Sequence, residues 1–288
     1  MPRYKGMMRD HLHNNPYGVD KKTLVTGGCS FSVDGCWPTQ LAYGLDMEYM
    51  IAGQSGAGNE FIMTATLFNI SNLLSEGKSP EDLLVGVMWS GADRITHHFI
   101  DAEENGLGDC SGAWGKISDE SGDYITFAPA QVNASRQNIN TGKNRYADLG
   151  DFILNELYAT DVQRILHTLK SIFTLQEYLK RHEIQYFFMK FTEDAFFQWI
   201  FDRDCTPTSG LGWEHDDIKW WAELIDWDKF IEGGMYQWCY DHADRPFVEE
   251  KKFGWEPTRN SPQHPTHSQH RQYTEQVIIP YLKENSYV

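Results

Sequence analysis

The sequence lacks the marks of several large classes of protein. None of its 5 cysteines forms a C-x-x-C pair, so we expect neither a zinc ribbon nor a disulfide framework, and reduced thiols are predicted. No apolar run approaches the roughly 20 residues that cross a bilayer, and the polar start does not resemble a signal peptide. No repeat period is visible. These absences predict a cytoplasmic protein without a membrane partner.

Basic residues are also few. Lys and Arg number 25 against 41 Asp and Glu, which gives a formal net charge of -16 at pH 7. Such a charge repels polyanions, so nucleic acid is not an expected partner. No G-x-x-x-x-G-K-[ST] pattern is present, and the glycines near residue 55 are not interpreted as a phosphate loop. No cofactor is expected, and composition does not define the oligomeric state.

What the chain does have is enough apolar sequence for a large core. Of its 288 residues, 41% are hydrophobic and 14% are aromatic. Apolar runs typical of buried strands alternate with helical spacing. Strands are predicted at 23–28, 47–52, 83–89 and 184–191, and helices at 37–45, 60–76, 152–183 and near the end of the chain. This order predicts an α/β fold: a doubly wound, flavodoxin-like parallel sheet in a three-layer α/β/α sandwich.

Two stretches interrupt this order. Residues 101–151 are rich in Gly, Asn, Ser and Asp without a sustained period, which predicts a surface insertion. Residues 192–256 contain most of the tryptophans among acidic residues, which predicts a second insertion with an aromatic core. Aromatic faces beside carboxylates also suit sugar rings, so this segment is a candidate wall for a carbohydrate ester. No linker divides the chain, and 1–288 is interpreted as a single domain.

The loop after the first predicted strand carries the first candidate for chemistry. Ligands of open parallel sheets bind beyond the carboxyl ends of the strands, where Ser30 lies. A serine nucleophile needs a base and donors for the developing oxyanion. His264, just before the last predicted helix, is the candidate base, and the amides of Ser30 and Gly56 are candidate donors.

Three short blocks carry a family resemblance. The blocks are G-G-C-S-F-S at 27–32, A-G-Q-S-G-A-G-N at 52–59 and H-P at 264–265. Together they resemble the SGNH (GDSL-type) hydrolases, in particular SGNH-like proteins common in phages and environmental bacteria. The resemblance implies Ser30 as nucleophile, Gly56 in the oxyanion hole and His264 as the histidine. If the chain is phage-encoded, the virion or the host cytoplasm is the expected location.

Two positions depart from the pattern of that family. Where it has an oxyanion asparagine, W-S-G-A-D-R at 89–94 has Asp93, and an ionised carboxylate cannot donate a hydrogen bond. Asn59 or Ser90 is then the candidate donor. Where the family has an aspartate three residues before the histidine, this chain has Ser261. A backbone carbonyl or Glu256 is the candidate partner that orients His264.

Other interpretations of these residues stay open. Ser30 alone would be a helix-capping serine, and Cys29 is a rival nucleophile, although a buried structural thiol is commoner. His264, His267 and His270, together with His97 and His98, are the candidates for a metal site, although no H-E-x-x-H motif accompanies them and no metal is expected. His267 and His270 are otherwise interpreted as helix-start and surface residues. The leading hypothesis is a serine esterase acting on a small-molecule or carbohydrate ester. Its rivals are a non-catalytic scaffold, serving as a binding or phage structural module, and a metal-dependent hydrolase.

Overall fold

The computed structural model describes residues 21–99, 116–119, 122–128, 132, 145–193, 195, 215–243 and 264–288. Within these residues, no helix combines the length and the apolar character needed to span a bilayer. The strand predicted at 184–191, the two insertions and the closing helix are each described at least in part. Glu256 and Ser261 lie outside the described residues.

A four-stranded parallel sheet forms the centre of the molecule. Its strands are β1 (Thr23–Gly28), β2 (Glu48–Ile51), β3 (Leu83–Trp89) and β7 (Gln185–Lys190), in the order β2-β1-β3-β7. One turn of 3-10 helix, η3 (Pro80–Asp82), leads into β3. All three strand pairs are parallel, so the chain crosses over between them as a flavodoxin-like sheet does. The predicted fold class is confirmed.

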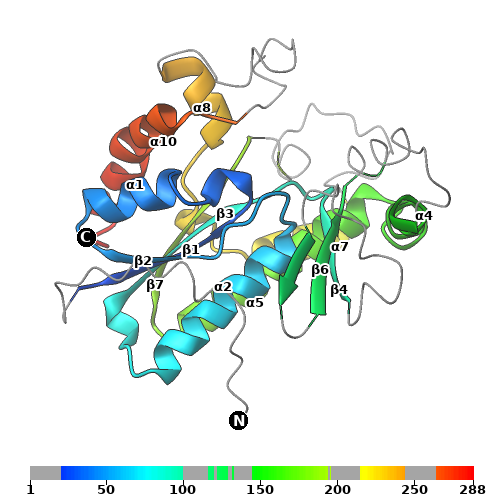
Figure 1. The fold of residues 1–288 in the computed structure, drawn as a ribbon, viewed down its shortest axis with the longest axis horizontal. Coiled ribbons are helices and arrows are strands. Elements are labelled where there is room, and N and C mark those ends of the chain that lie inside the picture. The colour runs from blue at the N-terminus through cyan, green and yellow to red at the C-terminus, as the bar shows by residue number, and fades with distance from the viewer. Residues whose placement is uncertain are drawn as a thin grey trace.

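Helices cover both faces of this sheet (Figure 1). On one face lie α2 (Asn59–Ser75), α5 (Asp161–Arg181) and α7 (Asp216–Glu223), which share a core cluster with the sheet. On the other face lie α1 (Trp37–Gly44), α8 (Met235–His242), α10 (His267–Tyr273) and α11 (Ile279–Glu284), with a second cluster. The three layers follow from strands that are apolar on both faces.

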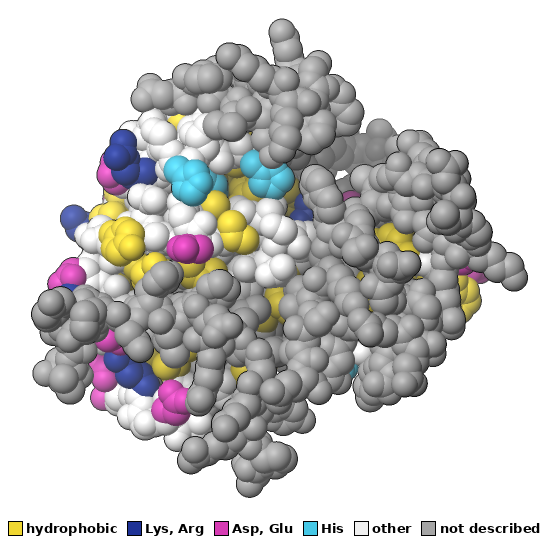
Figure 2. Space-filling view, viewed as in Figure 1, with side chains coloured by type: hydrophobic (Ala, Val, Ile, Leu, Met, Phe, Trp, Pro, Cys, Tyr) yellow, Lys and Arg dark blue, Asp and Glu magenta, His cyan; other side chains and the backbone are white. Residues whose placement is uncertain are grey.

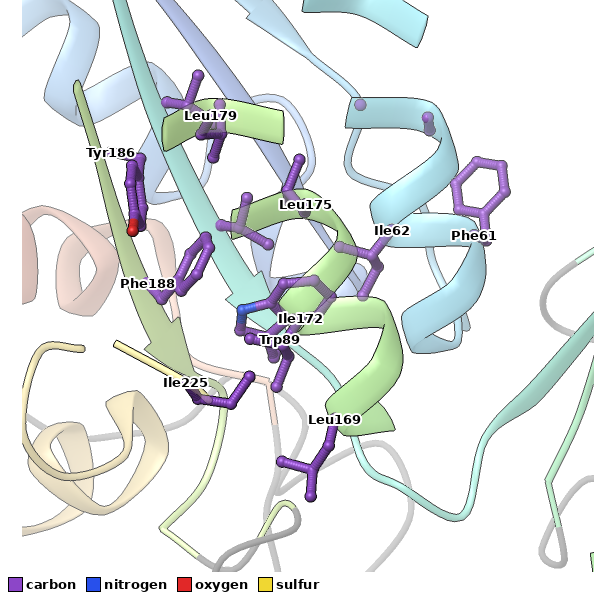
Figure 3. Packing of buried hydrophobic residues seen from close by; sticks show 14 of the residues in the cluster. Phe61, Ile62, Trp89, Leu169, Ile172, Leu175, Leu179, Tyr186, Phe188 and Ile225 are labelled. Carbon is purple, nitrogen blue, oxygen red and sulfur yellow. The ribbon is translucent and has the colours of Figure 1, made fainter. Parts of the chain in front are cut away.

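Alternation along each strand divides the core between the two faces. In β1, Val25 belongs to the cluster under α2 and α5, whereas Leu24 belongs to the opposite cluster. Figure 3 shows the first cluster, in which Trp89 and Phe188 of the sheet face Leu175 of α5. Each fully buried side chain of this size contributes about 1.5–3 kcal/mol relative to exposure. The sheet therefore gains hydrophobic stabilisation from both sides.

The long helix predicted at 152–183 is divided in two. A π-helical turn, η5 (Ile153–Leu157), ends at Tyr158, and α5 begins after a new N-cap. The Thr160 side chain accepts from the Gln163 amide while the Gln163 side chain accepts from the Thr160 amide, which is a capping box. The capping box starts a fresh helix where the hydrophobic period by itself predicted continuity.

The closing helix is also interrupted. A π-helical turn, η7 (Thr274–Ile278), joins α10 to α11. Pro280 lies in the first turn of α11 and has no N–H to donate to the preceding turn. This missing donor gives a physical reason for the irregular turn just before it.

A second sheet joins two strands from the region predicted as a surface insertion, 101–151, to a strand that lies just before it. Strands β4 (Ile95–Phe99), β5 (Lys116–Asp119) and β6 (Gly122–Phe127) pair antiparallel in the order β4-β6-β5. Together with α4 (Arg145–Phe152) and η5 they enclose a third apolar cluster, which includes Ile125 and Phe127. Short strands separated by polar turns leave no sustained period, which is why the sequence did not predict them.

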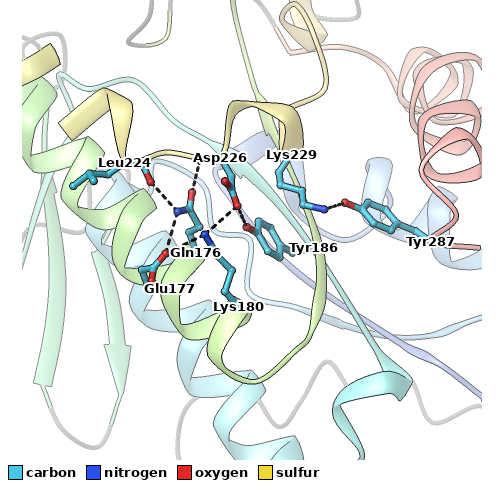
Figure 4. A network of polar contacts seen from close by, with 8 residues as sticks. All are labelled: Gln176, Glu177, Lys180, Tyr186, Leu224, Asp226, Lys229 and Tyr287. Carbon is cyan, nitrogen blue, oxygen red and sulfur yellow. Dashed lines mark hydrogen bonds and ion pairs between the residues drawn. The ribbon is translucent and has the colours of Figure 1, made fainter. Parts of the chain in front are cut away.

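The described part of the tryptophan-rich segment covers the exposed edge of the sheet. Ile231 N donates to Phe188 O of the edge strand β7 at 2.9 Å, after the 3-10 turn η6 (Trp227–Lys229). Figure 4 shows the polar contacts that fasten this segment: Gln176 of α5 accepts from Asp226 N at 2.7 Å, and Tyr186 donates to the Asp226 carboxylate at 3.0 Å. The segment therefore occupies the edge of β7 at Phe188, where a strand of another chain would otherwise pair.

Candidate active site

The turn after β1 carries Ser30 back over the end of its own strand. The 3-10 turn η2 (Ser30–Ser32) begins two residues after Gly28. A Cβ atom on Gly28 would lie 2.1 Å from Ser32 Oγ, so only glycine permits this close approach. The same Ser32 hydroxyl accepts a hydrogen bond from Trp37 Nε1 at 2.9 Å. Gly28 is therefore a packing requirement of the turn that presents Ser30.

The C-terminal segment is docked beside this turn by α10. Thr266 and Gln269 form a capping box at the start of the helix. His267 Nδ1 lies 2.8 Å from the carbonyl oxygen of Gly35, in the loop after Ser30, and donates to it. His267 is exposed and stands at the first helical position, as predicted. This contact fixes where the residues just before α10 come to lie.

Ser30 and His264 meet at this place. His264 Nε2 lies 2.7 Å from Ser30 Oγ, although 234 positions separate them in the chain. The Phe31 ring lies 5.3 Å from the His264 ring and limits its movement on one side. Figure 2 shows histidine side chains on this face of the molecule beside hydrophobic and uncharged ones. The hydroxyl and the imidazole are within the reach that proton transfer requires.

The loop after β2 lies directly against the turn that carries Ser30. Gln54 N donates to Gly28 O at 3.0 Å, and Ala57 N donates to Gln54 O at 3.1 Å. The second bond closes a turn whose third residue, Gly56, has φ +79°, a conformation that favours glycine there. Ser30 begins a helical turn, so its own N–H has no partner within that turn. The structure thus brings the two predicted oxyanion loops together.

Asn59 has a different place from the one expected. Its Nδ2 donates to Ser90 O at 3.1 Å and to Thr168 Oγ1 at 3.0 Å, and its Oδ1 accepts from Ser90 N at 2.8 Å. The side chain is fully buried. Both amide hydrogens already have acceptors, so none is left for an oxyanion. Asn59 instead holds the loop after β3 against the start of α2.

The remaining predicted residues do not join the pair. Ser90 is fully buried, and its hydroxyl has no hydrogen-bond partner. Asp93 is exposed, and its carboxylate lies back over Gly91, where a Cβ atom would be 2.4 Å from Asp93 Oδ1. Glu256 lies outside the described residues. The structure therefore supports neither Ser90 nor Asp93 as a member of the Ser30–His264 arrangement.

The histidines considered for a metal site are divided between two parts of the molecule. His97 and His98 lie on β4, whereas His264, His267 and His270 lie at and before α10. Within the described ranges, no three His, Cys, Asp or Glu side chains are grouped so that they could hold a metal ion. His270, expected at the surface, is buried and packs 6.2 Å from the Phe31 ring.

Acid is expected to destabilise the protein through His270. Burial, with added positive charge from His267 and His264, lowers the pKa of His270 from 6.5 to about 3. Below pH about 6.5, His270 is protonated in the unfolded chain but stays neutral in the folded one. The free energy of unfolding therefore falls by up to about 1.4 kcal/mol for each pH unit as the pH falls toward 3. Denaturant titrations between pH 7 and 4 should show a shallower acid loss for His270→Leu. The exposed-site variant His242→Leu should keep the wild-type slope, and equal slopes in all three proteins would contradict this account.

Gly53→Ala should separate the two loops of the site. A Cβ atom at Gly53 would lie 1.9 Å from the backbone oxygen of Ser32, which cannot move aside as a flexible side chain does. We expect a loss of about 1–3 kcal/mol in unfolding free energy from overpacking. In Gly77→Ala the new Cβ atom meets nothing within 4 Å, so only the strain of φ +95° remains. Thermal unfolding checks this: Gly53→Ala should unfold at a clearly lower temperature than the wild type and Gly77→Ala should stay closer to it, and an unchanged Gly53→Ala would disprove the loop contact.

Sequence reasoning missed the aromatic support of the site. Phe31 contacts His264, His270 and Phe191, the last with ring centroids 5.6 Å apart. Its position directly after Ser30 was the available signal, because a large side chain beside a nucleophile has to pack somewhere. No sequence pattern predicts that His267 docks α10 against the loop after Ser30, because its partner is a backbone carbonyl far away in the chain.

Fold and site together define a three-layer α/β protein with a serine–histidine pair at the carboxyl edge of its parallel sheet. The chain belongs to the family of unknown function DUF6071, whose pattern matches residues 19–237. The match spans Ser30 and the Gly56 loop and ends before His264. The SGNH resemblance stays a prediction from the motifs.

No curated protein matches the chain. Among solved structures, the crystal structure of the acetyl xylan esterase AlAXEase is similar over 88% of this chain and 96% of that chain, with a TM-score of 0.37 and 10% sequence identity. Similarity at this level carries no conclusion about activity.

Proposed function

We propose that the protein is an SGNH-like serine hydrolase that cleaves an ester through an acyl-enzyme on Ser30. The observation that carries the proposal is the 2.7 Å contact between Ser30 Oγ and His264 Nε2. The contact lies at the carboxyl edge of a doubly wound sheet, where such folds bind their ligands. A capping serine would have no need of a histidine brought from the other end of the chain.

The reaction proceeds in two halves. His264 Nε2 takes the proton of Ser30 as Oγ attacks the ester carbonyl carbon, and the same nitrogen then gives that proton to the departing alcohol. Water, deprotonated by His264, attacks the acyl-enzyme, and Ser30 leaves with its proton restored. The backbone N–H groups of Ser30 and Gly56 hold the oxyanion in both halves. Because Asn59 has no free amide hydrogen, this hole depends on backbone donors.

The substrate is proposed to be a small-molecule or carbohydrate ester, with an O-acyl sugar as the finer proposal. The described tryptophans of the 192–256 segment are engaged in packing: Trp221 lies against Phe173, and Trp238 against Tyr273. The support for a sugar therefore comes from the aromatic composition of this segment. A carboxylate such as Glu256, or a backbone carbonyl, is proposed to orient His264.

A fluorophosphonate probe tests the proposal directly. The purified protein should hydrolyse p-nitrophenyl acetate and become labelled at one site, and mass spectrometry of peptides should place the adduct on Ser30. Excess substrate should slow the labelling. Absence of both hydrolysis and labelling would reject the hydrolase in favour of a non-catalytic scaffold, serving as a binding or phage structural module. That rival is motivated by Asp93 and Ser261, which replace the amide donor and the acid of the family.

A further inference from the structure

Arg94 lies at the edge of the sheet that carries the Ser30–His264 pair, and among the described residues no carboxylate forms an ion pair with it. Arg94 follows β3 in a turn closed by the bond from Arg94 N to Gly91 O at 3.2 Å. Its backbone abuts the loop after β2, because a Cβ atom on Gly58 would lie 2.5 Å from Arg94 O. Arg94 thus stands at the same edge of the sheet as the nucleophile.

Aromatic side chains connect this guanidinium to the pair. Arg94 Cζ lies 5.4 Å from the centroid of the Phe191 ring. Phe191 makes an edge-to-face contact with Phe31, and Phe31 contacts His264. Phe31, Arg94 and Phe191 follow β1, β3 and β7, which are consecutive in the sheet. Neighbouring parallel strands deliver the three side chains to one place.

The Phe191 ring packs against the Arg94 guanidinium, but no described carboxylate balances its charge. Nη1 of Arg94 is buried and has no hydrogen-bond partner, and among the described residues no carboxylate forms an ion pair with it. Neighbouring Asp93 is exposed and turned toward Gly91. A buried charged donor without an acceptor is costly, so the arrangement is explained best by a ligand that supplies one.

We propose that Arg94 binds a carboxylate on the ester substrate and so selects anionic esters. The proposal rests on the hydrolase function proposed above. The planar guanidinium matches a carboxylate through two parallel N–H donors, and the Phe191 face keeps it oriented. The ligand is therefore an ester whose acyl or alcohol part carries a carboxylate, and Arg94 acts as a binding residue that does not touch the reacting atoms.

Matched substrates separate the two positions of the carboxylate. For the acyl side the pair is p-nitrophenyl hemisuccinate and p-nitrophenyl butyrate; for the alcohol side it is 4-acetoxybenzoate and its methyl ester. Arg94→Gln should lower kcat/KM for one charged substrate by about 10- to 100-fold, mainly through KM, and leave both neutral esters unchanged. Arg94→Lys should recover part of the loss, and Arg181→Gln, an exposed arginine at the end of α5, should change nothing. Equal losses on charged and neutral esters, or no loss on either charged one, would overturn the proposal.

A binding measurement keeps this proposal distinct from the catalytic one. Calorimetry with monomethyl succinate and with 4-hydroxybenzoate should show that at least one binds the wild-type protein and that Arg94→Gln weakens it by a similar factor. If no ester is hydrolysed but this binding and its loss are observed, the hydrolase fails and the anion site stands. If esters are hydrolysed but neither carboxylate binds more tightly to the wild type than to Arg94→Gln, the anion site fails.

Discussion

Ser30→Ala is expected to lower kcat/KM for p-nitrophenyl acetate by about 10,000-fold or more. The attack needs an oxygen at this position, and when a nucleophile is removed from a catalytic unit only oxyanion and binding effects remain. The His264 ring should stay in place, because Phe31 packs against it whether or not the hydroxyl is present. Steady-state hydrolysis and fluorophosphonate labelling both measure the change, and labelling should disappear.

The matched control for this change is Ser75→Ala. The Ser75 hydroxyl is exposed and donates only to Asn72 O, in the last turn of α2. It should keep wild-type activity and the same unfolding temperature as Ser30→Ala within a few degrees. A folded Ser30→Ala protein that still hydrolyses the ester at the wild-type rate would remove Ser30 from the mechanism and return it to the interpretation as a turn residue.

His264→Ala should be nearly as damaging, with a loss of about 1,000-fold or more at pH 7. Without the imidazole, the site has no side chain that accepts the Ser30 proton, and hydroxide becomes the only base. The residual rate should therefore rise by about tenfold for each pH unit, whereas the wild-type rate should not follow the hydroxide concentration in this way, because the protein has its own base. The pH dependence of kcat/KM for a neutral ester, with Arg94 left intact, is the measurement.

A control variant and a rescue experiment test whether the loss in His264→Ala is specific. His242→Ala changes an exposed histidine at the end of α8 and should keep the wild-type profile. Added imidazole should restore part of the activity of His264→Ala but none of that of Ser30→Ala. A His264→Ala protein with the wild-type pH profile would show that the observed contact has no catalytic part. If Glu256→Gln loses activity to the same degree, the orienting carboxylate is Glu256 and not a backbone carbonyl.

Much of the sheet follows from local sequence. Strands β1 and β3 have the predicted bounds, because each is a short buried run of apolar and β-branched residues with glycine at or soon after its end. Helix α5 was only partly predictable. Its apolar spacing continues through the π-helical turn η5, so the break is set by the capping box at Thr160 and not by periodicity.

The site divides in the same way. Ser30 could be chosen from sequence because a serine after the first strand of a doubly wound fold lies at the ligand-binding edge, and His264 because it precedes the closing helix. The prediction of Asn59 as an oxyanion donor was wrong, because its role depends on residues far away in the chain. Its hydrogen bonds go to Ser90 and Thr168, 31 and 109 positions away, and no local pattern reports such partners.

Sequence by itself determined the layers of this protein and the two candidate residues, because hydrophobic period and strand order act over short stretches of chain. Only the tertiary structure decided that the hydroxyl and the imidazole touch, that both hydrogens of the Asn59 amide are already bonded, and that Arg94 has no counter-charge among the described residues. Those outcomes depend on distances between residues far apart in the chain. The packing of three strand ends against α10 sets these distances, and no single segment encodes it.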